Sequence, residues 1–200
     1  MAFLRSGIGA EGLPLLRAQR LFLRAPQMSD YGPWAELRAV SRDHLVPWEP
    51  QWSRDELTRQ AFRRRIRHYQ RELKEDQGYA FFIFRIADDA LLGGLTMSNV
   101  RRGVTQSAAI GYWLGRPHIG SGHMTEALRA AVTFGFDDVG LHRLEAACLP
   151  HNRTSISVLE RIGFRREGLA RQYLKIDGRW QDHALFALIS DDLRRGREAL

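Results

Sequence analysis

The residues best placed to do chemistry lie at 112–127, YWLGRPHIGSGHMTEA, where an apolar strand leads through two glycines into an amphipathic helix. Several backbone N–H groups converge at such a helix start, with the positive end of the helix dipole behind them. Gly120 and Gly122 let the backbone approach a diphosphate without a Cβ in the way. The turn lacks the Gly-Lys-Ser/Thr ending of a nucleotide P-loop and the third glycine of a dinucleotide fingerprint. It therefore predicts a different anion site, although a tight strand–helix connection would also explain the glycines.

A second strand–turn–helix unit follows at residues 141–164. Arg143–Leu149 is expected to be a buried strand that ends at Pro150, and Asn152 is expected to cap a helix that ends at Gly163. Two consecutive units of this length predict crossover connections within a mainly parallel region of sheet. Asn152 has two interpretations, as a cap alone or as an amide that also binds an amide-rich ligand.

The rest of the pattern predicts one α/β domain with a mixed sheet, helices on both faces, and an antiparallel first half. Residues 1–18 are expected to form a flexible extension and residues 19–195 the domain. The expected elements are a strand at 21–24, a helix from Ser29 or Asp30 to Arg42, a helix from the capping box Ser53-x-x-Glu56 to about Lys74, hairpin strands at 79–86 and 91–99, a strand at 108–114, and a last hairpin at 165–174 and 181–189.

Several motifs resemble a known family. The order G-x-G-x-M-T-E-A-L at 120–128, then P-H-N-x-x-S at 150–155 and L-x-R-x-G-F at 159–164, resembles the GCN5-related N-acetyltransferases (GNAT), which use acetyl-coenzyme A. A narrower resemblance is to the bacterial ribosomal-protein alanine N-acetyltransferases, the Rim J/L group. It rests on V-P-W-E-P at 46–50, S-N-V-x-R-G at 98–103 and Y-L-x-I-D-G-x-W-x-D-H at 173–183. The motifs run in the expected order and cover about residues 21–189.

The resemblance implies a mostly antiparallel mixed sheet whose two central strands, 109–114 and 143–149, splay apart around the acyl-pantetheine arm. It also implies that backbone amides of the glycine turn bind the diphosphate, with no metal ion. This chain has Ile119 where the family usually has Gln or Arg, which removes one side-chain contact. The residues expected to bind acetyl-coenzyme A are Tyr112, Trp113, Leu114, Ile119, Gly120, Ser121, Gly122, His123, Met124, Thr125, Asn152 and Arg153, the last of which is equally well explained as a surface arginine.

The implied reaction transfers acetyl from a thioester to an amine. Many relatives carry a tyrosine acid on the second crossover helix, and Leu159 occupies that place here. Glu49 is expected to hold or deprotonate the incoming ammonium, and Cys148 and Ser155 are expected near the thioester, with Ser155 as a donor to the thiolate. Each has a structural alternative: Glu49 as a solvated carboxylate, Cys148 as a small buried residue, Ser155 as a helix-cap or surface hydroxyl. The acceptor is expected to contact Trp48, Asn99 and Tyr173.

Composition limits the remaining classes of protein. The single cysteine excludes an internal disulfide and suits a reducing cytoplasm. No apolar run reaches the ~18 residues of a membrane span, and the first residues do not form a secretory signal. The net charge of +7 suits anionic coenzyme A or a partner coated with RNA. No zinc-ligand spacing or stacking-aromatic motif accompanies the charge, so we expect no direct recognition of nucleic acid.

These observations favour a cytoplasmic acetyltransferase that acts, as a monomer or homodimer, on a protein N-terminus, with the alanine of a ribosomal protein as the expected acceptor. Two alternatives stay open. One is an acetyltransferase for a small amine such as a polyamine, an amino acid or an aminoglycoside, which an acidic pocket would favour. The other is a catalytically silent acyl-coenzyme A sensor or ribonucleoprotein-binding module.

Overall fold

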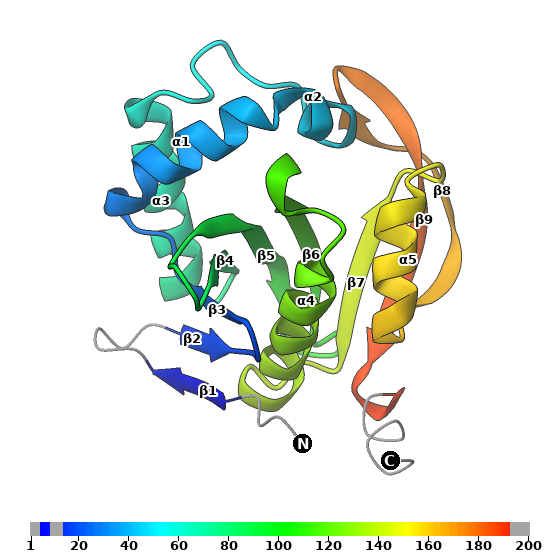
Figure 1. Ribbon diagram of the computed structural model, residues 1–200. Helices are drawn as coiled ribbons and strands as arrows, with labels where there is room; N and C mark the ends of the chain where they lie inside the picture. The colour runs from blue at the N-terminus through cyan, green and yellow to red at the C-terminus, as the bar shows by residue number, and fades with distance from the viewer. Residues whose placement is uncertain (1–4, 9–13, 193–200) are drawn as a thin grey trace.

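The described part of the chain folds around a nine-stranded sheet with helices on both faces (Figure 1). This computed structural model describes residues 5–8 and 14–192 of the 200. The helices are α1 (Tyr31–Val40), α2 (Arg42–Leu45), α3 (Arg59–Lys74), α4 (His123–Thr133), which continues as a π-helical turn at Phe134–Asp138, and α5 (Arg153–Ile162), with short 3-10 turns at Met28–Asp30, Val46–Trp48 and Arg116–His118. The strands are β1 (Arg5–Ile8), β2 (Pro14–Arg17), β3 (Leu21–Arg24), β4 (Tyr79–Arg85), β5 (Leu91–Arg101), β6 (Ser107–Leu114), β7 (Arg143–Cys148), β8 (Arg165–Ile176) and β9 (Arg179–Ile189).

The sheet has the order β1-β2-β3-β4-β5-β6-β7-β9-β8, and every neighbouring pair is antiparallel except β6 with β7. This parallel pair is short, because it joins only Ser107–Ala109 of β6 to Arg143–Glu145 of β7. Beyond these residues the two strands separate, which confirms the predicted mixed, mostly antiparallel sheet with a central splay. The expected parallel region is therefore limited to one pair, since the other edge of β7 pairs with antiparallel β9.

Both faces of the sheet are covered, and β4 shows this in its alternating side chains. Phe81 and Ile83 pack into the larger core with α4 and α5, whereas Phe82 and Phe84 pack into a second core with α1 and α3. All four phenylalanine and isoleucine side chains are buried. Two apolar layers thus hold the sheet rigid beneath the segments that carry the site. Within the described residues, no helix is long and apolar enough to cross a membrane.

Helix α3 begins later than the sequence predicts. Its N-cap is Thr58, whose hydroxyl oxygen accepts a hydrogen bond from the Ala61 N–H at 3.2 Å. The expected cap residue, Ser53, donates its hydroxyl proton to Asp55 at 2.8 Å instead. The prediction that a capping box at Ser53 opens the helix is therefore wrong: residues 54–57 form turns, and Thr58 supplies the cap.

Part of the predicted N-terminal extension forms strands. Strands β1 and β2 form an antiparallel pair, and β2 continues the sheet beside β3. Leu16 of β2 is 2 % exposed and belongs to the larger core, which explains why this short strand is held in place. The division into a flexible extension over residues 1–18 and a domain from residue 19 stays a prediction. Residues 1–4 and 9–13 lie outside the described residues.

Candidate active site

The glycine turn between β6 and α4 has the backbone geometry of an anion site. Gly122 is the N-cap of α4, with a left-handed φ of 77°, and Gly120 has the same φ. No side chain caps the first turn of α4, so its free N–H groups remain available at the positive end of the helix dipole. A Cβ built on Gly120 would meet no atom within 4 Å, so the space above the turn is open.

The other residues predicted to bind a ligand at the turn offer mainly their backbone. Met124 is 6 % exposed and packs into the larger core, and Ile119 is apolar and 46 % exposed. His123 is buried, and its Nδ1 lies 3.3 Å from the carbonyl oxygen of His118. The Ser121 carbonyl oxygen accepts a hydrogen bond from Arg20 at 3.2 Å. Backbone amides rather than side chains of 119–125 therefore form the predicted site.

Where β6 and β7 separate, a hydroxyl pair bridges the gap. The Tyr112 hydroxyl of β6 lies 2.9 Å from the Ser155 hydroxyl of α5 and 3.3 Å from the Ser155 carbonyl oxygen. Cys148, at the end of β7, is 8 % exposed and close to the same serine. The structure thus brings together two of the three predicted catalytic residues, Cys148 and Ser155, and adds the Tyr112 hydroxyl.

Burial sets the protonation of these groups. It raises the pKa of the Tyr112 hydroxyl far above its ordinary value, which the hydrogen bond with Ser155 only partly offsets. Burial likewise raises the pKa of the Cys148 thiol, against smaller lowering effects of Ser155 and Arg166. Both groups are therefore protonated at neutral pH. A protonated Cys148 is a poor nucleophile, because the thiolate is the reactive form.

Asn152 serves as the cap that the sequence predicts. Its Oδ1 accepts a hydrogen bond from the Ser155 N–H at 3.1 Å, and its side chain also lines the main cavity. The amide nitrogen therefore stays available to a ligand. Arg153 does not line this cavity; it lies with His151 and Trp180 in a separate, more open hollow beside β8 and β9.

A cavity of about 580 Å³ connects the splay to the loop that carries Glu49. Tyr112 and Trp113 line it, whereas Leu114 lies beyond it and pairs with Gly93 of β5. Among the predicted site residues, those that line the cavity are Trp48, Glu49, Tyr112, Trp113, Cys148, Asn152 and Ser155. One end of the cavity is thus the gap between β6 and β7, which carries the Tyr112 and Ser155 hydroxyls. The other end is a wall of charged and aromatic side chains around Glu49.

Glu49 is held in that wall by a two-pronged ion pair. Arg38 of α1 donates from Nη1 and Nη2 to the two carboxylate oxygens at 2.8 and 2.7 Å, and Trp52 donates from Nε1 at 2.8 Å. Arg38 is 5 % exposed, and its guanidinium lies 4.3 Å from the Trp52 ring and 5.1 Å from that of Trp113. The carboxylate is therefore fixed in orientation. This suits it to bind an ammonium group rather than to carry a proton away as a general base.

A second ion pair stands beside the first. Glu56 accepts a hydrogen bond from Arg65 of α3, and its carboxylate lies 3.8 Å from Arg38. Both pairs line the cavity. Because each carboxylate is matched by an arginine, this wall is charged without being acidic.

The tip of the β8–β9 hairpin closes the same end of the cavity. The Asp177 N–H donates to the Glu49 carbonyl oxygen at 2.9 Å, and Leu174, Lys175 and Ile176 line the cavity. The loop that carries Glu49 and the hairpin are therefore joined through their backbones, although 128 residues of sequence separate the bonded pair.

The three predicted acceptor contacts lie in different places. Trp48 lines the cavity, with its ring centroid 5.5 Å from that of His151. Tyr173 is outside the lining, half exposed, and packs edge-on against His183, which does line the cavity. Asn99 is exposed at the far end of β5, in a register irregularity, with a φ of 53° that asparagine tolerates. The structure therefore does not bring Asn99 to the cavity.

Sequence reasoning missed two residues of this region. Arg38 lies on the helix before the loop that it holds, eleven residues from Glu49, and Arg20 contacts a turn 101 residues away. Arg38 is the one arginine of α1, and nothing next to it in the sequence signals that it is buried among tryptophans. The contact of Arg20 has no local signal at all, because it depends on how β3 and α4 pack.

The class of protein follows from the splayed sheet, the open glycine turn, and the cavity that runs from the splay to the loop carrying Glu49. The sequence profile described as "Acetyltransferase (GNAT) domain" matches residues 20–165. The chain belongs to this family and is an acetyltransferase of the GNAT type, which confirms the resemblance drawn from its motifs.

Individual relatives cover nearly the whole chain. "Probable N-acetyltransferase YjcK" of Bacillus subtilis (strain 168) is 37 % identical over 178 residues, 89 % of this chain and 98 % of that protein. "[Ribosomal protein uS5]-alanine N-acetyltransferase" of Escherichia coli (strain K12) is 34 % identical over 182 residues, 91 % of this chain and 94 % of that protein. The structure of RimJ of Mycobacterium smegmatis in complex with CoA-disulfide superposes with a TM-score of 0.84 at 34 % identity, over 90 % of this chain and 88 % of that one.

Proposed function

We propose that the protein transfers acetyl from acetyl-coenzyme A to the N-terminal α-amine of a protein, with the alanine of a ribosomal protein as its acceptor. The observation that carries this proposal is the continuous cavity from the Tyr112–Ser155 pair to Glu49. It offers a thioester and an amine one place in which to meet. The 34 % identity to a uS5-alanine N-acetyltransferase over 91 % of the chain supports the choice of acceptor.

The chain's residues fit acetyl-coenzyme A. The two glycines at positive φ leave an open cradle over uncapped helix amides, which suits a diphosphate. The gap between β6 and β7 exposes strand edges on which an amide-bearing arm can pair. When bound, acetyl-coenzyme A supplies an acetyl thioester as the electrophile.

At the acceptor end, Glu49 accepts hydrogen bonds from the incoming ammonium while Arg38 and Trp52 fix its position. An α-amine has a pKa of about 7.7–8.0, so a substantial fraction is neutral near pH 7 and needs little help from a base. Holding the nitrogen in line with the thioester carbonyl is then the main contribution of this wall.

At the other end, Ser155 donates its hydroxyl hydrogen bond toward the sulfur that leaves. Tyr112 stays protonated because burial raises its pKa. Its hydroxyl is a second donor that supports the Ser155 hydroxyl. The ammonium first releases one proton to solvent, and the neutral nitrogen then forms the bond to the acetyl carbon. As the C–S bond breaks, the nitrogen loses its second proton and the sulfur gains one. Cys148, a thiol in this environment, forms the wall beside the pair and takes no covalent part.

The paired charges also favour an α-amine over a polyamine. A site for a small polycation would need surplus carboxylates, but Glu49 and Glu56 are each matched by an arginine. A ribosomal acceptor would place the reaction in the cytoplasm, and we assign it to one domain over residues 19–195.

The test is thiol release from acetyl-coenzyme A with peptides that begin with Ala, Ser or Met, beside free lysine and spermidine. We expect the alanine peptide to react fastest and N-terminally blocked peptide to release no thiol above background. Faster reaction on the lysine side chain or on spermidine would discard the N-terminal assignment. Binding of coenzyme A without turnover on any amine would select a silent sensor.

A further inference from the structure

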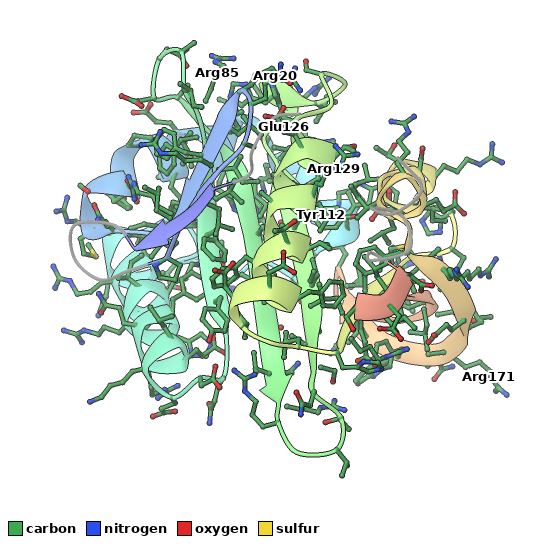
Figure 2. The ribbon with its side chains drawn as sticks, turned by 90° about the horizontal axis from the view of Figure 1, so that it is seen from below. Arg20, Arg85, Tyr112, Glu126, Arg129 and Arg171 are labelled. Carbon is green, nitrogen blue, oxygen red and sulfur yellow. The ribbon has the colours of Figure 1, made fainter. Side chains whose placement is uncertain are left out.

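The glycine turn has a cationic neighbour from a distant part of the sequence. Arg20, in the connection between β2 and β3, reaches the N-terminal end of α4, where Figure 2 shows it beside Glu126. Its Nε donates to Glu126 at 2.8 Å, and its Nη1 donates to the Ser121 carbonyl oxygen at 3.2 Å. A guanidinium is thus attached to the turn itself.

The backbone of Arg20 is fixed as well as its side chain. Its N–H donates to the other Glu126 oxygen at 2.6 Å, and its carbonyl oxygen accepts a hydrogen bond from the Ile86 N–H at 2.9 Å. Bonds on both sides of the residue limit the entropy that would be lost on binding a ligand. The guanidinium is therefore preorganised at this end of α4.

One corner of the guanidinium remains without an acceptor in the described chain. Nη2 makes no hydrogen bond there, and it lies 3.6 Å from the position that a Cβ on Gly122 would take. Among the described residues other than the chain neighbours of Gly122, no other atom lies within 4 Å of that position. Nη2 therefore lies beside the N-cap of α4, next to the amides that no side chain caps. Ile119, which leads into the turn, adds no polar side chain.

We propose that the Nη2 group of Arg20 binds the coenzyme diphosphate together with the backbone amides of the turn. This inference rests on the proposed use of acetyl-coenzyme A and assigns a residue to that site. Glu126 neutralises part of the charge of Arg20 and holds its guanidinium in place. The net attraction for a diphosphate therefore comes from directed N–H donors more than from long-range charge.

Calorimetric titration of coenzyme A and of 3′-dephospho-coenzyme A tests this. In Arg20→Ala both ligands should bind about tenfold more weakly, because one charge-assisted contact is lost. Arg171→Ala is the matched control: Arg171 is exposed on β8, away from the turn in Figure 2, and its loss removes the same formal charge. Both affinities should be unchanged in that variant.

A purely structural role for Arg20 makes a different prediction for Glu126→Gln. If the ion pair only held the loop, this variant would bind coenzyme A as weakly as Arg20→Ala, and the proposal would fall. We expect instead that Glu126→Gln binds at least as tightly as the wild type, because it keeps an oxygen acceptor and removes the opposing charge. The melting temperature of each ligand-free variant reports any general loss of structure.

Two further results would overturn the assignment. An unchanged affinity in Arg20→Ala would show that Arg20 is not a ligand, and a loss with coenzyme A alone would place it on the 3′-phosphate. Failure of the wild-type protein to bind coenzyme A would instead defeat the proposed function. The inference about Arg20 and the function can thus fail separately.

Discussion

The two ends of the candidate site, the glycine turn before α4 and the cavity wall around Glu49, are built in opposite ways. The coenzyme end uses contiguous backbone: a strand, two glycines at positive φ and a helix start within residues 112–127. The acceptor end uses side chains from α1, the 3-10 turn Val46–Trp48 and its following loop, α3 and the β8–β9 hairpin, joined by ion pairs. Backbone sites tolerate side-chain change, whereas the assembled wall depends on each partner. Substitutions in the glycine turn should therefore weaken binding of coenzyme A, whereas substitutions in the wall should weaken use of the acceptor.

The largest effect is expected from Gly122→Val. A non-glycine residue at a φ of 77° costs about 1–2 kcal/mol, and the branched side chain would also displace the diphosphate from the turn. The ligand-free variant relieves this strain by turning the amides away, so the cost returns on binding. With one lost charge-assisted contact, this predicts roughly 100-fold weaker binding of coenzyme A, measured by calorimetry. The acceptor KM should hardly change.

Gly32→Ala is the control for this substitution. Gly32 lies in α1, has no left-handed φ, and a Cβ there meets no atom within 4 Å. It should leave coenzyme binding unchanged. If Gly122→Val bound coenzyme A normally, the contiguous-backbone description of that end would be wrong.

Glu49→Gln should act on the other end. It keeps the shape but removes the charge that holds an ammonium, so kcat/KM for the alanine peptide should fall about 30-fold. Calorimetry should show the wild-type affinity for coenzyme A. Because the change leaves the buried Arg38 guanidinium without its main partner, the melting temperature should also fall.

Glu75→Gln, on the exposed C-cap of α3, is the matched loss of a carboxylate and should change neither quantity. An unaltered rate in Glu49→Gln would remove Glu49 from the acceptor site. Equal losses of coenzyme and acceptor binding would show that the two ends are not independent.

Tyr112→Phe should have a smaller effect on the rate, because Tyr112 lies between the two ends. It removes one hydroxyl that supports Ser155, and a neutral hydrogen bond is worth about 1 kcal/mol, so kcat should fall about fivefold. Since burial raises the tyrosine pKa far above neutral, the wild-type rate should show no Tyr112 titration between pH 6 and 9. The pH–rate profile of both proteins checks this; a basic limb that disappears in the variant would contradict it.

Cys148→Ala should have the smallest effect, with a rate within about threefold of the wild type, because only a few van der Waals contacts are lost. The raised pKa lowers the thiolate fraction at any pH below it, so iodoacetamide should alkylate the folded protein at pH 8 more slowly than the unfolded protein. Cys148→Ser would test separately whether the polarity of this side chain matters. Loss of all activity in Cys148→Ala would instead point to covalent catalysis.

The sequence predicts the glycine turn better than it predicts the wall around Glu49. The turn at Gly120 and Gly122 and the Asn152 cap could be predicted, because each is encoded in a short contiguous motif. The splay was expected only from the resemblance to the family. The capping box at Ser53 was misleading, since Thr58 offers a second hydroxyl cap a few residues later and the helix starts there.

Contacts between distant segments left no such signal. Arg38 and Arg20 are two of 28 arginines, and nothing in their neighbours marks them as partners of Glu49 and Glu126. Asn99 belongs to a recognisable motif, yet its place at the far end of β5 depends on the register with β6. Strands β1 and β2 are too short to show a periodicity, and only packing of Leu16 reveals their place.

The single backbone hydrogen bond from Asp177 to Glu49 has a mechanical consequence. The proposed acceptor is a whole protein, so only its first residues would enter the cavity and its body would rest against the hairpin tip that closes this end. Because that tip is joined to the backbone at Glu49, a load on the tip also acts on the loop, while Arg38 and Trp52 keep the carboxylate oriented. We expect long acceptors to load this joint and short peptides to leave it unloaded.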